Sequence, residues 1–226
     1  MILSDLHLGY SDYLLSKGIY SLISESNMIK EITKKINDFK IDVLVFNGDI
    51  IHDFGSFPRR LKNRIFSLVS QCREHNCEPI LVVGNHDVQL KYLLQKQDFS
   101  LDMTFNDKIV FGDVFITHGH KLLDLPEKSK FLILGHEHPA LLINDAKFKC
   151  YLITDYKING ENMGTAIIMP SFFEFVEGTH FSEDNKLSPY HKFFIKNYSK
   201  ILVSKYNNKY LTLPLKLTEF MSFDSL

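Results

Sequence analysis

A junction that recurs five times constrains what this chain can fold into: a short apolar run ends in a cluster of Asp, Asn, Gly and His. The clusters are SDLH at 4–7, GD at 48–49, GNHD at 84–87, HGH at 118–120 and GHEH at 135–138. Apolar runs of this length, bounded by turn-forming residues, are typical of buried β-strands. In open α/β sheets, ligands bind beyond the carboxyl ends of the strands. The polar loops are therefore expected to converge on one site.

The remaining hydrophobic pattern predicts an α/β protein. Helical spacing covers residues 28–39, the stretch that starts at Pro58, and residues 88–96, with Phe39 and Phe66 in the expected apolar stripes. The strand-like runs are 2–3, 41–46, 79–83, 101–105, 108–111, 114–117, 131–134, 141–143, 148–153 and 165–169, with a last hairpin at 200–204 and 210–213. This order predicts a mixed sheet or two stacked sheets flanked by helices. We expect one domain over residues 1–226, in which a tail at 182–226 adds the hairpin.

Composition excludes several classes of partner. The formal net charge is −1 and the pI is about 6.8, so no overall basic field attracts nucleic acid or anionic lipid. The apolar runs are far shorter than the roughly 20 residues that span a bilayer, and no signal peptide is visible. The three cysteines match no zinc spacing and are interpreted as reduced thiols. These features predict a soluble cytoplasmic protein with no membrane partner.

The donor types in the clusters indicate a metal site. Carboxylate, amide and imidazole groups suit Mn²⁺, Fe, Zn²⁺ or Ni²⁺, and the lack of a thiolate argues against a structural Cys-zinc site. The clusters also hold more ligands than one ion with open positions needs. Two ions that share a bridging carboxylate fit this inventory better.

Taken in order, the five clusters resemble the signature of the calcineurin-like metallophosphoesterases. The matching blocks are Asp-x-His, Gly-Asp, Gly-Asn-His-Asp, a strand-terminal His-Gly and Gly-His-x-His, and they span residues 5–138. The runs GHEHPALLI and MPSFFEFVEG are similar to a branch of small prokaryotic phosphoesterases that includes ligase-associated ones. The resemblance implies a four-layer αββα sandwich of two mixed sheets flanked by helices. It also implies an enzyme that hydrolyses a phosphodiester by attack of a metal-bridged hydroxide on phosphorus.

The resemblance assigns a metal-binding role to seven residues. Asp5, His7 and His138 would hold one ion, Asn85, His118 and His136 would hold the other, and Asp49 would bridge them. The cofactor would be two divalent ions, with Mn²⁺ as the first expectation and Fe, Zn²⁺ or Ni²⁺ as alternatives. The short run before Asp5, only Met1 to Ser4, is a departure from the family pattern and is expected to weaken the support for the first ligands.

The resemblance also suggests catalytic and substrate-binding residues. His86 would protonate the leaving oxygen, and with Asn85 it would contact the substrate; Asp87 would orient the His86 ring or cap the following helix. His52, in a GDIIH stretch similar to that of repair nucleases in the superfamily, is either a substrate-side residue or part of a solvated loop. His120 is expected near the ligands on the substrate side. Arg59 could meet a substrate phosphate, although a solvated helix face is favoured for the basic cluster to which it belongs.

Substrate choice stays open at this point. A phosphodiester in a nucleotide or nucleic acid is the preferred substrate, and a phosphomonoester or a nucleotide pyrophosphate is the alternative within the same fold. A non-catalytic scaffold that retains the fold is a hypothesis of a different class, which the complete ligand set argues against. A homodimer and a helicase or ligase partner are conceivable, and the sequence does not specify them.

Overall fold

The computed structural model describes residues 1–20, 24–52, 58–95, 100–143, 146–158, 161–176, 178–180, 187–206 and 209–215. The chain divides into two compact units, Met1–Asp107 and Lys108–Leu226. The α/β class is confirmed, because two sheets and several helices account for the described residues. None of the helices in those residues is long and apolar enough to cross a membrane. Whether the two units behave as the single domain that we expect stays a prediction.

The sheet of the first unit is built from four short strands. They are β1 (Ile2–Leu3), β2 (Val43–Asn47), β3 (Glu78–Val82) and β4 (Thr104–Asn106), hydrogen-bonded in that order. Every pair is parallel, whereas mixed sheets were expected. Parallel order places the carboxyl ends of β1, β2 and β3 at one edge, and the first three polar clusters follow these ends directly. The last strand begins later than the expected start at residue 101.

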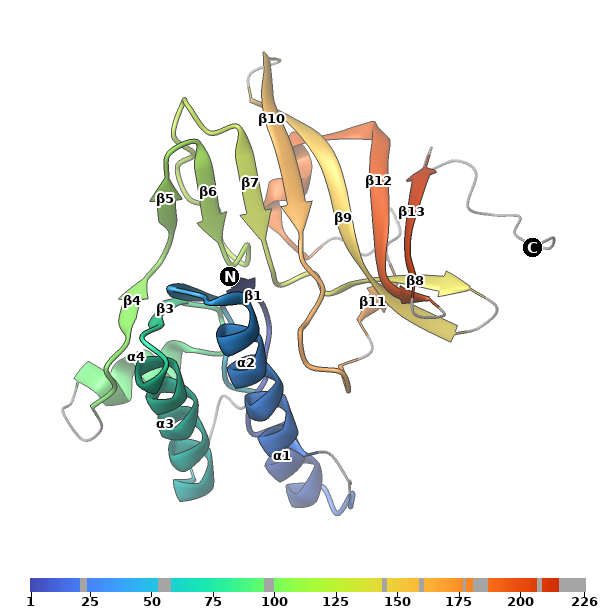
Figure 1. Ribbon diagram of the computed structural model, residues 1–226. Coiled ribbons are helices and arrows are strands. Elements are labelled where there is room, and N and C mark those ends of the chain that lie inside the picture. The colour runs from blue at the N-terminus through green and yellow to red at the C-terminus, as the bar shows by residue number, and fades with distance from the viewer. Residues whose placement is uncertain are drawn as a thin grey trace. The chain divides into compact units, whose positions relative to one another are not determined.

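Four helices accompany this sheet: α1 (Tyr10–Ser16), α2 (Glu25–Phe39), α3 (Arg59–Glu74) and α4 (Val88–Gln95). Figure 1 shows α2 and α3 side by side, and each buries one apolar stripe. Two residues of the expected stripes are exposed instead. Phe39, the last residue of α2, is 71% exposed, and Phe66 is 57% exposed. Because each helical residue turns by about 100°, Phe66 points away from the side on which its neighbour Ile65 is buried.

A buried carboxylate fastens these helices together. Glu25, at the start of α2, accepts hydrogen bonds from the backbone N–H groups of Gly9 and Ser11, each at 3.0 Å. The Arg64 guanidinium of α3 lies 3.0 Å from the same carboxylate and also pairs with Asp12. Arg64 therefore has structural partners inside the unit.

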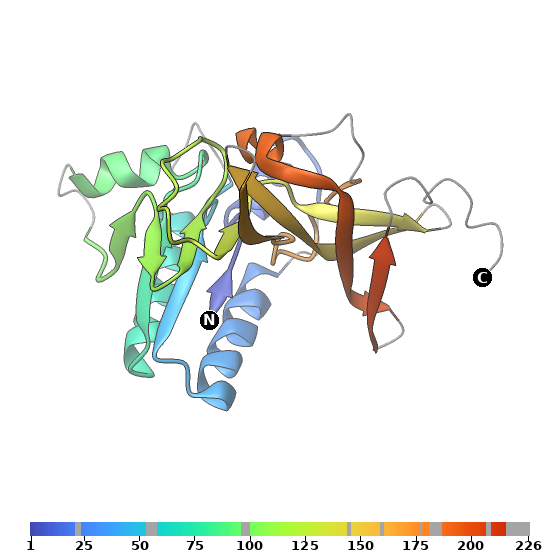
Figure 2. The same cartoon turned by 90° about the horizontal axis from the view of Figure 1, so that it is seen from above.

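The second unit contains a nine-stranded sheet. Its strands are β5 (Ile109–Phe111), β6 (Val114–Thr117), β7 (Phe131–Leu134), β8 (Pro139–Ile143), β9 (Ala146–Ile158), β10 (Glu161–Ile168), β11 (Thr179–His180), β12 (Phe194–Tyr206) and β13 (Lys209–Leu215). The long strand β9 is antiparallel to β8, β10 and β12, while β6, β7 and β10 pair in parallel. The expected last hairpin is confirmed as β12 and β13, in orange and red in Figures 1 and 2.

A 3₁₀-helix, η1 (Pro189–Phe193), leads into β12 and is anchored in the core of this unit. Its Tyr190 is fully buried among residues such as Phe115 and Leu134. The Tyr190 hydroxyl accepts a hydrogen bond from the backbone N–H of Leu123 at 3.0 Å. Burial raises the pKa of Tyr190, so this hydroxyl stays neutral. The segment before β12 is thus held firmly against the sheet.

Candidate functional site

The loops that follow β1 and β2 run beside each other in the first unit. The backbone N–H of Asp5 donates to the carbonyl of Gly48 at 3.1 Å, and that of His7 donates to the carbonyl of Asp49 at 2.9 Å. The Asp5 carboxylate also accepts a hydrogen bond from the Ser4 hydroxyl. Asp5, His7 and Asp49 are all buried. The first three predicted ligands are therefore held together by main-chain contacts although β1 is only two residues long.

The backbone at the predicted ligands is unusual. Seven non-glycine residues among those described have positive φ, and five of them are predicted ligands: Asp5, His7, Asp49, His136 and His138. Each such residue costs roughly 1–2 kcal/mol relative to ordinary backbone. The remaining two, Lys40 and Asn76, lie directly after or close to the ends of α2 and α3, where left-handed residues commonly end helices. The five ligand positions lack that explanation, and strain of this kind gathers at functional sites.

Three imidazoles meet in the first unit. Nitrogen atoms of His7, His52 and His86 lie within 4.8 Å of one another, a spacing that could hold a metal ion. The Nδ1 atoms of His52 and His7 are 3.5 Å apart. The His52 ring also makes edge contacts with the rings of Tyr10 and Tyr13, at centroid distances of 4.7 and 4.9 Å. His52 is therefore half-buried in a cluster of rings, and its substrate-side role stays a prediction.

The orientation of His86 is fixed by one hydrogen bond. Its Nδ1 lies 2.6 Å from the carbonyl oxygen of His52. Since a carbonyl can only accept, Nδ1 must carry a proton, and Nε2 is the nitrogen left for chemistry. That Nε2 is 3.9 Å from the Asp49 carboxylate, whose other oxygen accepts the backbone N–H of His86 at 2.9 Å. The ring is thus held beside the residue predicted to bridge two metal ions.

Asp87 connects two of the loops. Its fully buried carboxylate accepts hydrogen bonds from the backbone N–H groups of Gly84 at 2.9 Å and Ile51 at 3.3 Å. This links the loop after β3 to the loop after β2. The neighbouring ligand candidate Asn85 is half-buried in the same turn, and Arg59 is exposed at the first position of α3. The roles predicted for these three residues stay predictions.

The second unit brings three further histidines together. His118 is fully buried just after β6. Its ring centroid lies 5.1 Å from that of His136 and 5.3 Å from that of His120. The rings of His120 and His136 are 6.2 Å apart. His138 follows His136 by two residues, and Glu137 N donates to the carbonyl of Gly135 at 2.8 Å. The predicted ligands of this unit thus occupy two adjoining loops.

Sequence reasoning missed the group that supports these loops. Glu137 is 4% exposed and accepts hydrogen bonds from the backbone N–H groups of Leu187 and Ser188. His191, which lies outside the five polar clusters, has its Nε2 2.9 Å from the same carboxylate. Burial by itself would raise the pKa of Glu137, but the hydrogen bonds from His191 and the two backbone groups outweigh it and lower the pKa. Glu137 and His191 are 54 residues apart, so no local pattern could have indicated this contact.

The donors in each unit fit a divalent ion of borderline character. Imidazole nitrogens and carboxylate oxygens are present, and the cysteines are not available as thiolate ligands. All three are buried, and burial raises the pKa of Cys72 and of Cys150 to about 12. This donor chemistry suits Mn²⁺, Fe, Zn²⁺ or Ni²⁺.

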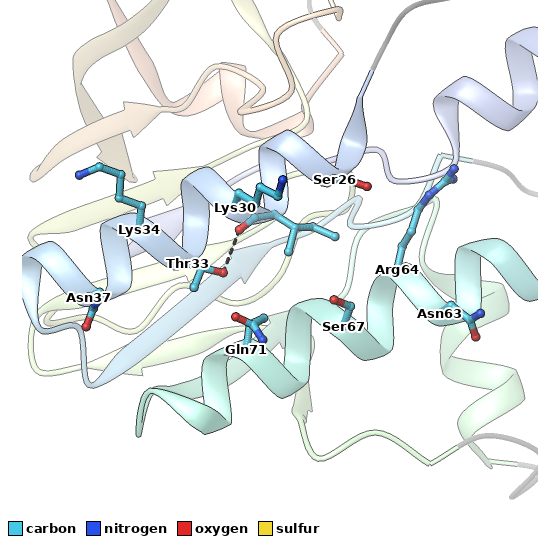
Figure 3. A pocket seen from close by; sticks show the side chains of 10 residues that line it. Ser26, Lys30, Thr33, Lys34, Asn37, Asn63, Arg64, Ser67 and Gln71 are labelled. Atoms are coloured by element: carbon cyan, nitrogen blue, oxygen red, sulfur yellow. Dashed lines mark hydrogen bonds between the residues drawn. The ribbon is translucent and has the colours of Figure 1, made fainter.

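A pocket of about 610 Å³ lies elsewhere in the first unit, between α2 and α3. Figure 3 shows the lining residues on the two helices, with Lys30, Lys34 and Asn37 on α2 and Ser67 and Gln71 on α3. None of the predicted site residues lines it. The pocket therefore adds nothing to the metal-binding residues.

The chain is similar to known proteins in structure and matches one family model. Among solved structures, the nuclease MPE of Pseudomonas putida has a TM-score of 0.58 and 15% sequence identity, over 95% of this chain and 86% of that one. The YfcE phosphoesterase of E. coli has a TM-score of 0.44 and 14% identity, over 96% of this chain and 98% of that one. A comparison with curated protein sequences gives no significant match. The family model for calcineurin-like phosphoesterases matches residues 1–159, more than half of the chain, and the chain therefore belongs to that family.

Proposed function

We propose that this protein is a metal-dependent phosphodiesterase that acts on a nucleotide or a nucleic acid. Family membership supports the coarser activity, hydrolysis of a phosphoester bond. The choice of a diester rests on the GDIIH stretch around His52. The similarity in fold to a structure described as a nuclease is compatible with this choice.

The observation that carries the proposal is the backbone strain at the ligand positions. Five of the seven proposed ligands have left-handed backbone conformations. At about 1–2 kcal/mol each, this amounts to roughly 5–10 kcal/mol, comparable to the whole stability of many domains. A chain that had lost metal binding would have no use for this strain. The scaffold hypothesis is therefore the weaker one.

The proposed ligand set comes from both units. Asp5, His7, Asp49 and Asn85 belong to the first unit, and His118, His136 and His138 belong to the second. We assign two divalent ions to these residues, with Asp49 as the shared ligand and Mn²⁺ as the first candidate. Bound ions of this kind neutralise charge on a phosphoryl group and activate water for in-line attack.

His86 is the proposed general acid. Because its Nδ1 donates to the His52 carbonyl, a proton for the leaving oxygen must come from Nε2. Asp87 keeps this turn in place through its bonds to Gly84 and Ile51 and need not contact the substrate. His52, His120 and Arg59 are the proposed substrate-side residues.

The first experiment measures metal content and activity together. Purified protein would be stripped with EDTA, reloaded with Mn²⁺, Ni²⁺, Fe²⁺ or Zn²⁺, and assayed on bis-p-nitrophenyl phosphate. We expect metal-dependent hydrolysis that Asp49→Asn nearly abolishes. An absence of both metal uptake and hydrolysis with every ion would refute the enzyme assignment.

A substrate panel then tests the diester preference. Mono-esters, 2′,3′- and 3′,5′-cyclic nucleotides, a nucleotide pyrophosphate, single-stranded DNA and RNA would be compared under the best metal. We expect the highest kcat/KM on a diester. A preference for p-nitrophenyl phosphate or for the pyrophosphate would instead support the alternative activities within the family.

A further inference from the structure

A carboxylate between two proposed ligands is fully engaged by a distant segment. Glu137 separates His136 from His138, and its side chain is directed to residues beyond the part of the chain that matches the family model. The Leu187 N–H donates to Oε1 at 3.1 Å and to Oε2 at 3.3 Å. The Ser188 N–H and the His191 ring both reach Oε1. Four donor contacts to one buried carboxylate make this a strong anchor.

The anchor acts on a strained piece of backbone. His136 and His138 have φ values of 68° and 45°, on either side of Glu137. Without a tether, a short loop of this kind would relax toward ordinary conformations, since each left-handed residue costs about 1–2 kcal/mol. The bonds to the Glu137 side chain oppose that relaxation. They thereby fix the directions of the Cα–Cβ bonds of His136 and His138.

The same segment holds the second ligand-bearing loop. The Ser188 hydroxyl donates to the carbonyl of Gly119 at 2.7 Å, one residue after the proposed ligand His118. Gly119 has a φ of 103°, another left-handed position. The two loops are also joined directly, because the Gly135 N–H donates to the His118 carbonyl at 2.9 Å. Ser188 therefore contacts both loops, through its N–H and through its hydroxyl.

Residues 178 and 179 also contact the loop that carries His138. The Thr179 N–H donates to the His138 carbonyl at 2.8 Å. Gly178 packs so closely that a Cβ there would lie 2.6 Å from the same carbonyl oxygen. The loop that carries His136 and His138 is thus held at Glu137 and at His138 by residues outside the matched region.

We propose that residues 187–191 are a positioning element for metal binding, and that Glu137 is the positioning residue through which they act on His136 and His138. The proposal rests on the proposed function, because it assumes that His118, His136 and His138 bind metal. It assigns a role in metal affinity to a part of the chain that the family model does not include.

Removing such supporting contacts typically weakens metal binding by about 10- to 100-fold. We expect Glu137→Ala to fall in this range. Glu137→Gln keeps a side-chain oxygen as acceptor for the backbone donors and should lose less. Glu127→Gln is the matched control, because Glu127 is an exposed glutamate of the same unit.

The experiment titrates Co²⁺ into full-length, EDTA-treated protein and follows the visible absorption of the bound ion. It is run well below the Tm of each metal-free variant, so that every sample is folded. A purely structural Glu137 would lower the Tm of Glu137→Ala and leave the Co²⁺ affinity unchanged. The proposal expects a weaker Co²⁺ affinity, partial rescue by Glu137→Gln, and no effect of Glu127→Gln.

Two further variants separate the possible failures. His136→Ala tests the underlying assignment: if wild-type protein binds no Co²⁺, or if His136→Ala binds like wild type, the proposed ligand set is wrong. If His136→Ala is weakened but Glu137→Ala binds like wild type, only the positioning role is refuted. Should Glu137→Ala not fold, His191→Phe replaces it, because it removes the donor while keeping a ring against Phe194. Unchanged Co²⁺ affinity in His191→Phe would then refute the proposal.

Discussion

Gly84 is the position where one added methyl group should disturb the site most. A Cβ placed on Gly84 would lie 2.2 Å from Oδ1 of Asp49 and 2.4 Å from its backbone nitrogen. The backbone of Gly84 does not require glycine by its φ angle, so the obstacle is space alone. An alanine here must displace the Asp49 carboxylate or the loop that carries it.

The cost can be worked from these contacts. Forcing a methyl group into a packed site costs about 1–3 kcal/mol. Moving the carboxylate also breaks the 2.9 Å hydrogen bond from the His86 N–H, and a bond to a charged acceptor contributes about 1.5–3 kcal/mol. The sum is about 2.5–6 kcal/mol, a large share of the 5–15 kcal/mol that stabilises a typical domain. For a chain of this length it corresponds to a fall in Tm of roughly 5–24 °C.

Urea unfolding followed by circular dichroism measures this loss, with Gly18→Ala as the control. Gly18 lies in the same unit with a φ of 76° and nothing within 4 Å of an added Cβ. Its substitution should cost only the left-handed backbone penalty, about 1–2 kcal/mol. We also expect Gly84→Ala, and not Gly18→Ala, to weaken metal binding. If Gly84→Ala were no more destabilising than Gly18→Ala, the close packing described between Gly84 and Asp49 would be wrong.

Three other predictions follow from the same structure. His86→Ala should lower kcat by about 10²- to 10⁴-fold while metal content by mass spectrometry stays at the wild-type level; turnover at the wild-type rate would exclude the acid role. Glu25→Gln should lower the free energy of unfolding by about 3 kcal/mol, which is the low end of the range for breaking a buried ion pair. The low end applies because Arg64 is partly exposed and still pairs with Asp12. Cys72 and Cys150, whose pKa values burial raises to about 12, have a thiolate fraction of roughly one in ten thousand at pH 8. Native protein should therefore leave both thiols unreacted with Ellman's reagent at pH 8 and react fully in urea, and rapid labelling of either residue in native protein would contradict their burial.

The sequence was informative where apolar runs meet polar clusters. Strands β6 and β7 have the predicted bounds, because each is a short, mainly apolar run that is followed directly by a polar cluster. The clusters after β1, β2 and β3 lie at one edge of a parallel sheet, and this follows from strand direction alone. Residue types and their order were therefore enough to bring these three clusters to one edge, while the ligand roles stay predictions.

Other features left no such signal. Helix α1 buries none of its residues, so it lacks the apolar stripe by which a helix is recognised. The strand β11 is two residues long, too short for any period. The exposure of Phe66 depends on which side of α3 faces the unit's core, and hydrophobicity alone placed it in the stripe. The partners of Glu137 lie 50 or more residues away, and only the folded chain brings them together.

The contact between Glu137 and Ser188 has a consequence for the order in which the protein matures. The two residues are 51 positions apart, and closing a loop of that size precedes any stabilisation that the contact gives. Ligand residues 118–138 leave the ribosome well before residues 187–191, so their loops should acquire their final shape only late in synthesis. A fragment ending at residue 159 would carry every proposed ligand and still lack the donors that hold Glu137. Metal uptake should therefore follow completion of the chain and not the appearance of its last ligand.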